Sequence, residues 1–286
     1  MTIVITGATG QLGRLVVEAL LDQNVPAGQI VAAGRDLAKV ADLAERGVQV
    51  RKVDYSDPES LRQAFSGAKK VLLISGSEVG QRLEQHRNAI TAAKDAGVGL
   101  ITYTSIANAG STGMQLAAEH EATEAALMES GLPFTLLRNG WYLENYTDQL
   151  GSYVEHGAVL GSAGEGRVSA ATRADYAQAA ASVLLLEGQA GRVYELGGDV
   201  PFTLNELAEE VSSAAEQPVA YQDLPMEQYA KVLVGVGLPE AFAAILADSD
   251  RGIARGELLV TSGDLGRLIG RPTTSLREAV RAATGR

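Results

Sequence analysis

T-I-V-I-T-G-A-T-G-Q-L-G, residues 2–13, is an apolar strand that runs directly into a glycine-rich turn, and a stretch with helical periodicity follows. The turn has glycine at Gly7, Gly10 and Gly13. Such a turn lets backbone N–H groups approach a pyrophosphate, and the N-terminus of the next helix favours its negative charge. The stretch therefore predicts the first βα unit of a dinucleotide-binding fold. The alternative is a tight turn without a ligand, and the surrounding pattern decides between the two.

The pattern around this turn continues as alternating strands and helices. Short apolar runs alternate with longer helix-period stretches through the first half of the chain. The strand candidates are residues 2–6, 29–33, 48–53, 70–75, 100–105 and 134–138. Strands that are apolar on both faces are typical of a parallel sheet covered by helices. The six repeats therefore predict an α/β fold of the Rossmann type, with a doubly wound parallel sheet.

Helix boundaries in this half are marked by residues with known preferences. Asp57 is suited to cap a helix whose first position is Pro58. Gly47, Gly97 and Gly131 follow helix candidates where a left-handed residue is favoured. These signals support the same alternation of strands and helices.

The alternation of strand and helix candidates stops after residue 139. Residues 140–168 are glycine-rich and irregular, whereas a helix at about 173–187 and a strand at 192–196 return to the sheet pattern. From residue 201 the chain is mostly helical, with capping-box patterns at 203–206 and 275–278 and no comparable strand after 220. We expect an NADP-binding Rossmann domain in residues 1–139, rejoined by 170–198. Residues 140–169 and 199–286 are expected to form a smaller, mainly helical lobe that covers the substrate.

The composition excludes several classes of function. The chain has 286 residues, of which 46% are hydrophobic, enough for a large core. Its net charge of −11, without a basic cluster, argues against nucleic acid or an anionic membrane as partner. It has no cysteine, and its histidines His86, His120 and His156 are scattered, so no metal site is expected. Without a basic leader or a stretch long enough to span a membrane, we expect a cytoplasmic protein.

The end of the second strand predicts the cofactor. An NAD-specific site places a carboxylate there, to accept a hydrogen bond from the ribose 2′-hydroxyl. Here the strand ends in Gly34 and Arg35, and a guanidinium suits a 2′-phosphate. Asp36 is expected to cap the next helix. NADPH is therefore predicted in preference to NADH, and the alternative is that Arg35 is a solvated loop residue.

Polar residues also end three further strands. Asp54 and Tyr55 follow the third strand, where the adenine is usually flanked, and residues 75–77 follow the fourth at the switch point of the sheet. Residues 103–105 end the fifth. Ligands of open α/β sheets bind at this edge, so the shared placement favours a binding site over ordinary turn chemistry.

The glycine turn and Tyr103-Thr-Ser at the end of the fifth strand resemble the extended and atypical short-chain dehydrogenase/reductase superfamily. In its alcohol-oxidising members the next helix carries Tyr-x-x-x-Lys, whose lysine lowers the pKa of a tyrosine acid. In this sequence His120-Glu-Ala-Thr-Glu124 occupies that stretch. A glutamate raises the pKa of a neighbour, which is the reverse effect. No catalytic acid is therefore assigned; we expect His120 to line the pocket and Glu124 to be structural.

The absence of that acid restricts the hydride acceptor. Reduction of a ketone gives an alkoxide, which is too basic to form unassisted. Reduction of a quinone gives a hydroquinone anion whose charge is delocalised, so water or a single donor can supply the proton. The sequence thus favours an electron-poor, conjugated acceptor without selecting a quinone among them.

Longer motifs resemble the flavin-free bacterial NADPH:quinone oxidoreductases of the NmrA-like, atypical short-chain group. They are G-A-T-G-Q-L-G at 7–13, I-S-G-S-E-V-G-Q-R at 74–82, Q-H-R-N at 85–88, A-A-K-D-A-G-V at 92–98, L-L-R-N-G-W-Y-L-E-N-Y at 136–146, A-T-R-A-D-Y-A at 171–177 and A-D-S-D-R-G at 247–252. The resemblance runs to about residue 280. It implies NADPH on the Rossmann domain and a quinone in a cleft under the C-terminal lobe, without flavin or metal. A related group reduces triphenylmethane dyes and lacks the tryptophan at Trp141.

Two sets of site residues follow from the strand ends and from this resemblance. The residues expected to contact the dinucleotide are Gly7, Ala8, Thr9, Gly10, Gln11, Leu12, Gly13, Arg35, Asp54, Tyr55, Ser75, Gly76, Ser77, Tyr103, Arg138, Asn139, Trp141 and Arg173. Those expected to contact the substrate are Ser77, Tyr103, His120, Asn139, Trp141, Tyr142 and Asn145.

Some of these residues have a structural alternative. Asn139 is suited to bond a carboxamide, and Trp141 and Tyr142 offer a flat wall for a flat acceptor, but aromatic residues also occur in cores. Arg173 either contacts the cofactor or ties its helix to the sheet through an ion pair with Asp175.

Two functions remain open from the sequence. The first is an NADPH-dependent quinone reductase, monomeric or homodimeric, that transfers hydride directly to a small-molecule quinone; reduction of a triphenylmethane dye is a variant of it. The second is an NADP(H)-sensing regulator of the NmrA type, which binds the dinucleotide without turnover.

Overall fold

The computed structural model of the chain describes residues 1–285, which divide into two compact units. The first unit comprises Met1–Ile106, Glu119–Asn139 and Arg173–Tyr194. The second comprises Ala107–Ala118, Gly140–Thr172 and the described residues from Glu195 onward. The substrate-covering role expected for the C-terminal lobe stays a prediction.

A seven-stranded sheet forms the centre of the first unit within the described residues. Its order is β3 (Gln49–Lys52), β2 (Ile30–Gly34), β1 (Ile3–Ile5), β4 (Lys70–Leu73), β5 (Leu100–Ile106), β6 (Phe134–Asn139) and β8 (Arg192–Leu196). β1 lies between β2 and β4 and is parallel to both, with Ile3 opposite Ile30 and Lys70. Successive strands are therefore added on one side of β1 up to β3 and on its other side from β4 onward. The position beside β1 is the topological switch point, where ligands bind in doubly wound sheets.

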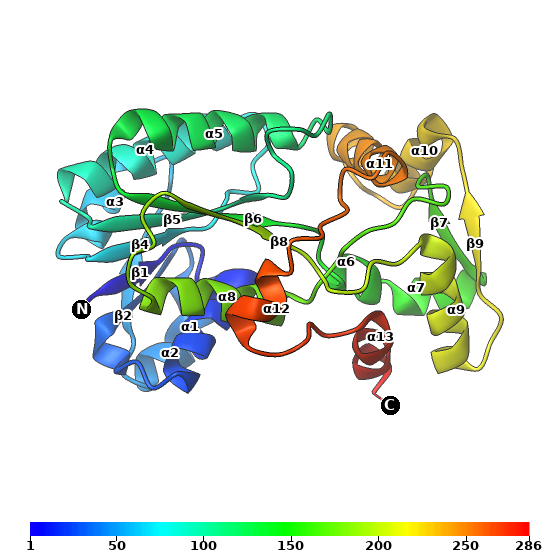
Figure 1. Cartoon of the computed structure of the whole chain (residues 1–286), viewed down its shortest axis with the longest axis horizontal. Helices are drawn as coiled ribbons and strands as arrows, with labels where there is room; N and C mark the ends of the chain where they lie inside the picture. Colours follow the sequence, from blue (N-terminus) through cyan, green and yellow to red (C-terminus); the bar gives the residue numbers. More distant parts are fainter. Residues whose placement is uncertain (286) are drawn as a thin grey trace. The chain divides into compact units, whose positions relative to one another are not determined.

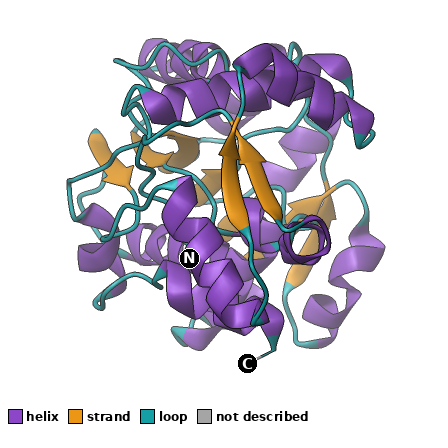
Figure 2. Ribbon diagram, turned by 90° about the vertical axis from the view of Figure 1, so that its right-hand side faces the viewer, coloured by secondary structure: helices purple, strands orange, loops and turns teal. Residues whose placement is uncertain are grey.

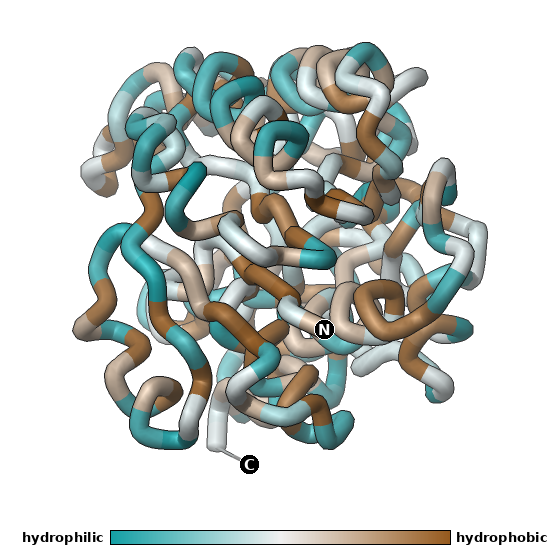
Figure 3. Tube along the Cα trace, turned by 90° about the vertical axis from the view of Figure 1, so that its left-hand side faces the viewer, coloured by the Kyte–Doolittle hydropathy of each residue, from teal (hydrophilic) through white to brown (hydrophobic). Residues whose placement is uncertain are grey.

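Helices cover both faces of this sheet (Figure 1). One face carries α1 (Gln11–Asp22), α2 (Ala41–Glu45) and α8 (Arg173–Leu185), and the other carries α3 (Pro58–Phe65), α4 (Arg82–Asp95) and α5 (Ala117–Ser130). Every residue of β1, β2, β4 and β5 is buried. Figure 3 shows several hydrophobic segments of the trace in the middle of the view. The predicted Rossmann-type fold is confirmed.

The helix boundaries predicted for this unit are also confirmed. The carboxylate of Asp57 accepts hydrogen bonds from the backbone of the first turn of α3, which opens with Pro58. Gly47, Gly97 and Gly131 have φ of +89°, +65° and +74°, the left-handed region that glycine tolerates. Short 3₁₀ turns occur at Ala27–Gln29 and Leu37–Val40, and Asp36 caps the second of them.

The second unit combines helices with a small sheet (Figure 2). Its elements are α6 (Glu144–Thr147), α7 (Leu150–His156), β7 (Ala158–Gly161), α9 (Leu204–Ala215), β9 (Ala220–Asp223), α10 (Met226–Gly235), α11 (Glu240–Ala254), α12 (Asp264–Ile269) and α13 (Leu276–Thr284). The capping boxes predicted at 203–206 and 275–278 open α9 and α13.

The two strands of the second unit were not predicted from the sequence. β7 and β9 pair in parallel, with Ala158 opposite Ala220. The expectation of an irregular segment at 140–168 and of no comparable strand after 220 was therefore wrong. Each strand has only four residues, and β9 reads A-Y-Q-D and is largely exposed. β7 is an apolar run, A-V-L-G, but it is too short to indicate a strand by itself, and β9 has neither an apolar run nor clear alternation.

Asp250 is a buried carboxylate in the second unit. It lies on α11, is 7% exposed, and its Oδ2 accepts a hydrogen bond of 2.7 Å from the backbone N–H of Ser162. Burial raises the pKa of Asp250 to about 7; the Ser162 bond acts in the opposite direction, and the charge of Asp223 adds to the rise. The folded protein thus binds a proton at Asp250 in a pH range where the unfolded chain, with an ordinary value of 3.8, does not.

The raised pKa of Asp250 predicts that the free energy of unfolding decreases as the pH rises. The contribution of Asp250 to the free energy of unfolding is largest below about pH 4 and is lost as the pH rises towards 7. We therefore expect Asp250→Asn to raise the Tm at about pH 8, with little change at about pH 4. Because one pKa unit corresponds to about 1.4 kcal/mol, a gain of about 1 kcal/mol or more is expected at the higher pH. Thermal unfolding at both pH values measures it, and an equal shift at both would contradict this account.

Candidate functional site

The turn after β1 is shaped by its glycines. Gly7 adopts a φ of +62°, and Gly10 is the N-cap of α1 without a side-chain cap of its own. A Cβ at Gly13 would lie 2.3 Å from the carbonyl oxygen of Gly7, which is backbone and cannot move aside easily. α1 therefore packs directly against the turn, and its uncapped N-terminus lies beside it. Backbone N–H groups in this arrangement suit a phosphate.

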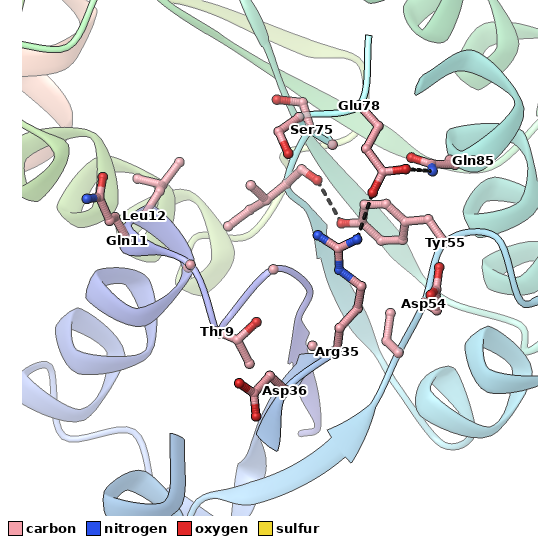
Figure 4. Close-up of a pocket in the computed structure, with 18 of the residues that line it drawn as sticks. Thr9, Gln11, Leu12, Arg35, Asp36, Asp54, Tyr55, Ser75, Glu78 and Gln85 are labelled. Carbon is pink, nitrogen blue, oxygen red and sulfur yellow. Dashed lines mark hydrogen bonds and ion pairs between the residues drawn. The ribbon is translucent and has the colours of Figure 1, made fainter. Parts of the chain in front are cut away.

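A cavity of about 390 Å³ opens beside this turn, at the carboxyl ends of β1 to β4 (Figure 4). Many of the residues predicted to contact the dinucleotide line it: Gly7, Thr9, Gly10, Gln11, Leu12, Gly13, Arg35, Asp54, Tyr55, Ser75, Gly76 and Ser77. Ala8 does not, since it is fully buried and its N–H bonds the carbonyl of Ala33. The cavity lies within the first unit and is of the size of a small-molecule site.

Seven further residues that line the cavity were not predicted from the sequence. They are Gly34, Asp36, Lys39, Val53, Ile74, Glu78 and Gln85. Lys39 lies one turn after Arg35, so a second positive charge after the second strand was a signal that could have identified it. Glu78 and Gln85 come from the β4–α4 segment and from α4, where no sequence pattern indicated that they turn towards the cavity.

Arg35 faces the cavity and forms an ion pair across it. Its Nη1 donates to Glu78 Oε1 at 2.7 Å, and Figure 4 shows the guanidinium directed at that carboxylate. The Arg35 side chain is 64% exposed. The guanidinium is thus available to an anionic group that enters from solvent.

The hydroxyl of Tyr55 is fixed by the strands beneath it. It donates to the carbonyl of Ile74 at 2.7 Å and lies 2.5 Å from Thr6 Oγ1. Burial raises the pKa of Tyr55, so the phenol stays neutral in the physiological range. Tyr55 therefore presents an uncharged ring to the cavity.

Both backbone polar groups of Gly76, its N–H and its carbonyl, form hydrogen bonds with side chains of α4. Its N–H donates to His86 Nε2 at 3.0 Å, and its carbonyl accepts from Arg82 Nε at 2.7 Å. His86 Nε2 is therefore unprotonated, and its Nδ1 lies 3.0 Å from Thr123 Oγ1. Burial, helped by the charge of Arg82, lowers the pKa of His86 to about 3. An imidazole that is neutral at physiological pH thus fixes this wall of the cavity.

Tyr103 and His120 lie in the interior of the first unit. Their side chains meet through a contact of 2.8 Å between the Tyr103 hydroxyl and His120 Nδ1, and the residues are 0% and 5% exposed. Burial and, to a lesser extent, Arg82 lower the pKa of His120 to about 3. Neither residue lines the cavity, so the expected contacts of Tyr103 and His120 with cofactor or substrate stay predictions.

Glu124 belongs to a buried ion pair and not to a pair with His120. It is 4% exposed and accepts hydrogen bonds from Arg138 Nε at 2.9 Å, Arg138 Nη2 at 2.6 Å and Ser105 Oγ at 2.5 Å. These bonds connect α5 with β5 and β6. Glu124 therefore stabilises the packing of α5 on the sheet, and its carboxylate binds the Nε and Nη2 groups of Arg138.

Asn139 ends β6 at the same edge of the sheet as the glycine turn. It is 5% exposed, and its Oδ1 is buried without a hydrogen-bond partner among the described residues. A buried acceptor without a donor is unfavourable by about 1–3 kcal/mol. A ligand that brings a donor would remove this cost.

The remaining predicted residues lie elsewhere. Arg173 opens α8 in the first unit. Trp141, Tyr142 and Asn145 belong to the second unit, where Tyr142 bridges to Ala171 and the N–H of Asn145 donates to the Tyr142 carbonyl. Trp141 and Tyr142 are partly exposed.

Residues 1–285 show neither a metal-binding cluster nor a membrane-spanning helix. No group of three or more histidine and carboxylate side chains is placed there to hold a metal ion. None of the helices in the same range is both long and apolar enough to cross a membrane.

Comparison with known proteins identifies relatives along the whole chain. Residues 7–186 match the model of a family described as NAD(P)H-binding. Quinone oxidoreductase 2 of Escherichia coli is 51% identical over 278 residues, which are 97% of this chain and 97% of that protein.

Solved structures are similar over the same length. The crystal structure of the Escherichia coli NADPH-dependent quinone oxidoreductase in complex with NADPH matches with a TM-score of 0.94 and covers 98% of both chains. The triphenylmethane reductase of Citrobacter sp., in complex with NADP(H), is 42% identical, with a TM-score of 0.93 over 99% of this chain and 100% of that one.

Proposed function

We propose that this chain, which belongs to the NAD(P)H-binding family that includes quinone oxidoreductase 2, is an NADPH-dependent quinone reductase. The observation that carries the proposal is the cavity at the switch point, which joins a glycine turn to a guanidinium at the end of β2. The cofactor of the similar Escherichia coli enzyme, NADPH, suits these groups.

The residues present fit this dinucleotide. The turn at Gly7, Gly10 and Gly13 places the N-terminus of α1 beside the cavity, where its backbone N–H groups suit a pyrophosphate. A Cβ at Gly13 would break the close packing of α1 against this turn. Arg35 and Lys39 supply two positive charges for the 2′-phosphate, and Tyr55 supplies a neutral surface beside it. NADPH would thus be bound by charge at one end of the cavity and by backbone in the middle.

The nicotinamide end is assigned to Asn139. Its buried Oδ1 has no donor within the described part of the chain, and a carboxamide N–H would supply one. NADPH, when bound, provides the hydride. The aromatic residues Trp141 and Tyr142 are proposed as the flat surface for a flat acceptor.

The absence of a protein acid agrees with a quinone. No Tyr-x-x-x-Lys pair exists in the sequence, and His120, whose pKa is lowered to about 3, is neutral at physiological pH. Such an imidazole can donate only weakly. The proton for a hydroquinone anion is therefore proposed to come from water, and no flavin or metal is required.

The experiment measures NADPH oxidation by purified protein without added flavin, using a simple benzoquinone and a triphenylmethane dye as acceptors. We expect quinone-dependent oxidation, with the dye reduced more slowly. Binding of NADPH without oxidation by any acceptor would instead support a dinucleotide-sensing regulator. Activity that appears only when flavin is added would refute direct hydride transfer.

A further inference from the structure

Glu78 is an acidic residue placed where an anionic ligand group is expected. It lies between β4 and α4 and lines the cavity, where its Oε1 accepts from Arg35 at 2.7 Å. Its other oxygen, Oε2, accepts from Gln85 Nε2 at 2.9 Å. Gln85 is 5% exposed, so it is a fixed donor. Both carboxylate oxygens are thereby engaged, and Figure 4 shows Glu78 between the two side chains.

This arrangement gives Arg35 a partner before any ligand arrives. A phosphate monoester carries between one and two negative charges near neutral pH. Like charges close together repel, so a 2′-phosphate and the Glu78 carboxylate disfavour each other at the same guanidinium. Binding of a 2′-phosphate to Arg35 therefore either displaces Glu78 from Nη1 or brings the phosphate close to the Glu78 carboxylate, and both are unfavourable.

A ribose without a 2′-phosphate meets different conditions. Its 2′-hydroxyl carries no charge and is a donor that a carboxylate can accept, as in NAD-specific sites. Glu78 need not leave Arg35 in that case. The same ion pair thus opposes a phosphorylated ribose and tolerates an unphosphorylated one.

We infer that Glu78 is a specificity-determining residue, which competes with the 2′-phosphate for Arg35 and so weakens the preference for NADPH over NADH. The inference rests on the proposed function only in taking Arg35 as the contact of the 2′-phosphate. It does not depend on the identity of the hydride acceptor.

The test compares two nucleotides that lack nicotinamide, adenosine 2′,5′-bisphosphate and 5′-AMP, by calorimetry at low salt. We expect Glu78→Gln to bind the bisphosphate about 1.4- to fivefold more tightly, because an exposed ion pair is worth about 0.2–1 kcal/mol. Binding of 5′-AMP should not change. The gain should shrink at high salt, since exposed charges are screened.

Glu84→Gln is the matched control, because it removes the same charge from an exposed position on α4 outside the cavity. It should leave both affinities unchanged. In the double variant Arg35→Ala with Glu78→Gln, the gain relative to Arg35→Ala should be smaller than in the parent protein, because the competition for the guanidinium is gone and only the direct repulsion between Glu78 and the phosphate remains.

Unchanged or weaker binding of the bisphosphate by Glu78→Gln overturns the inference, as does an equal gain for 5′-AMP. Neither measurement involves a quinone. A failure of quinone reduction would therefore contradict the proposed function alone, and the two results are distinguishable.

Discussion

Replacement of Arg35 by alanine is expected to weaken NADPH binding by roughly 10- to 150-fold and to leave NADH binding almost unchanged. The reason is that a hydrogen bond to a charged group contributes about 1.5–3 kcal/mol. Arg35 is 64% exposed and lies at the surface of the cavity, so the variant should fold normally. Dissociation constants from fluorescence titration with both cofactors measure the effect.

Arg46→Ala is a suitable control, since it removes an exposed arginine outside the cavity. It should bind both cofactors as the parent protein does. Equal losses for NADPH and NADH in Arg35→Ala would refute the assignment of Arg35 to the 2′-phosphate.

Replacement of Glu124 by alanine is expected to destabilise the fold by about 3–5 kcal/mol, because it leaves one partner of a largely buried ion pair without the other. Arg138 loses two hydrogen bonds and Ser105 loses one. Urea unfolding measures the change. The kcat of the folded fraction should fall by less than about tenfold, since a general acid contributes more, about 10²–10⁴-fold.

The matched substitution is Glu129→Ala, an exposed glutamate on the same helix. It should change the free energy of unfolding by no more than about 0.5 kcal/mol, as surface substitutions usually do. If Glu124→Ala were as stable as Glu129→Ala but inactive, Glu124 would have a chemical role.

The parts of the fold that were predictable are those whose signals are local. Some features involve only residues that are close in sequence, and a short segment is enough to predict them. They are the glycine turn at Gly7–Gly13, the cap at Asp57 and the capping boxes of α9 and α13. Strands β1, β2, β4 and β5 were predictable because burial on both faces gives nearly continuous apolar runs. β7 and β9 were missed because their partners, not their own residues, make them strands.

The same distinction applies to the site. Residues on the glycine turn and at the ends of strands line the cavity as expected, because parallel strands end at one edge. The engagement of Arg35 by Glu78 could not be predicted, since 43 positions separate the two residues. Likewise the burial of His120 against Tyr103, and the pairing of Glu124 with Arg138, depend on how α5 packs on the sheet and not on the spacing of His120 and Glu124.

The central claim is that hydride passes directly from NADPH to a quinone on this chain. Single-turnover oxidation of NADPH by excess benzoquinone, with deuterium placed on either face of C4 of the nicotinamide, tests it most directly. We predict a primary isotope effect for one face and none for the other, in protein without bound flavin. Oxidation no faster than in the absence of protein, or equal rates for both faces together with a flavin that is reduced first, would contradict the account.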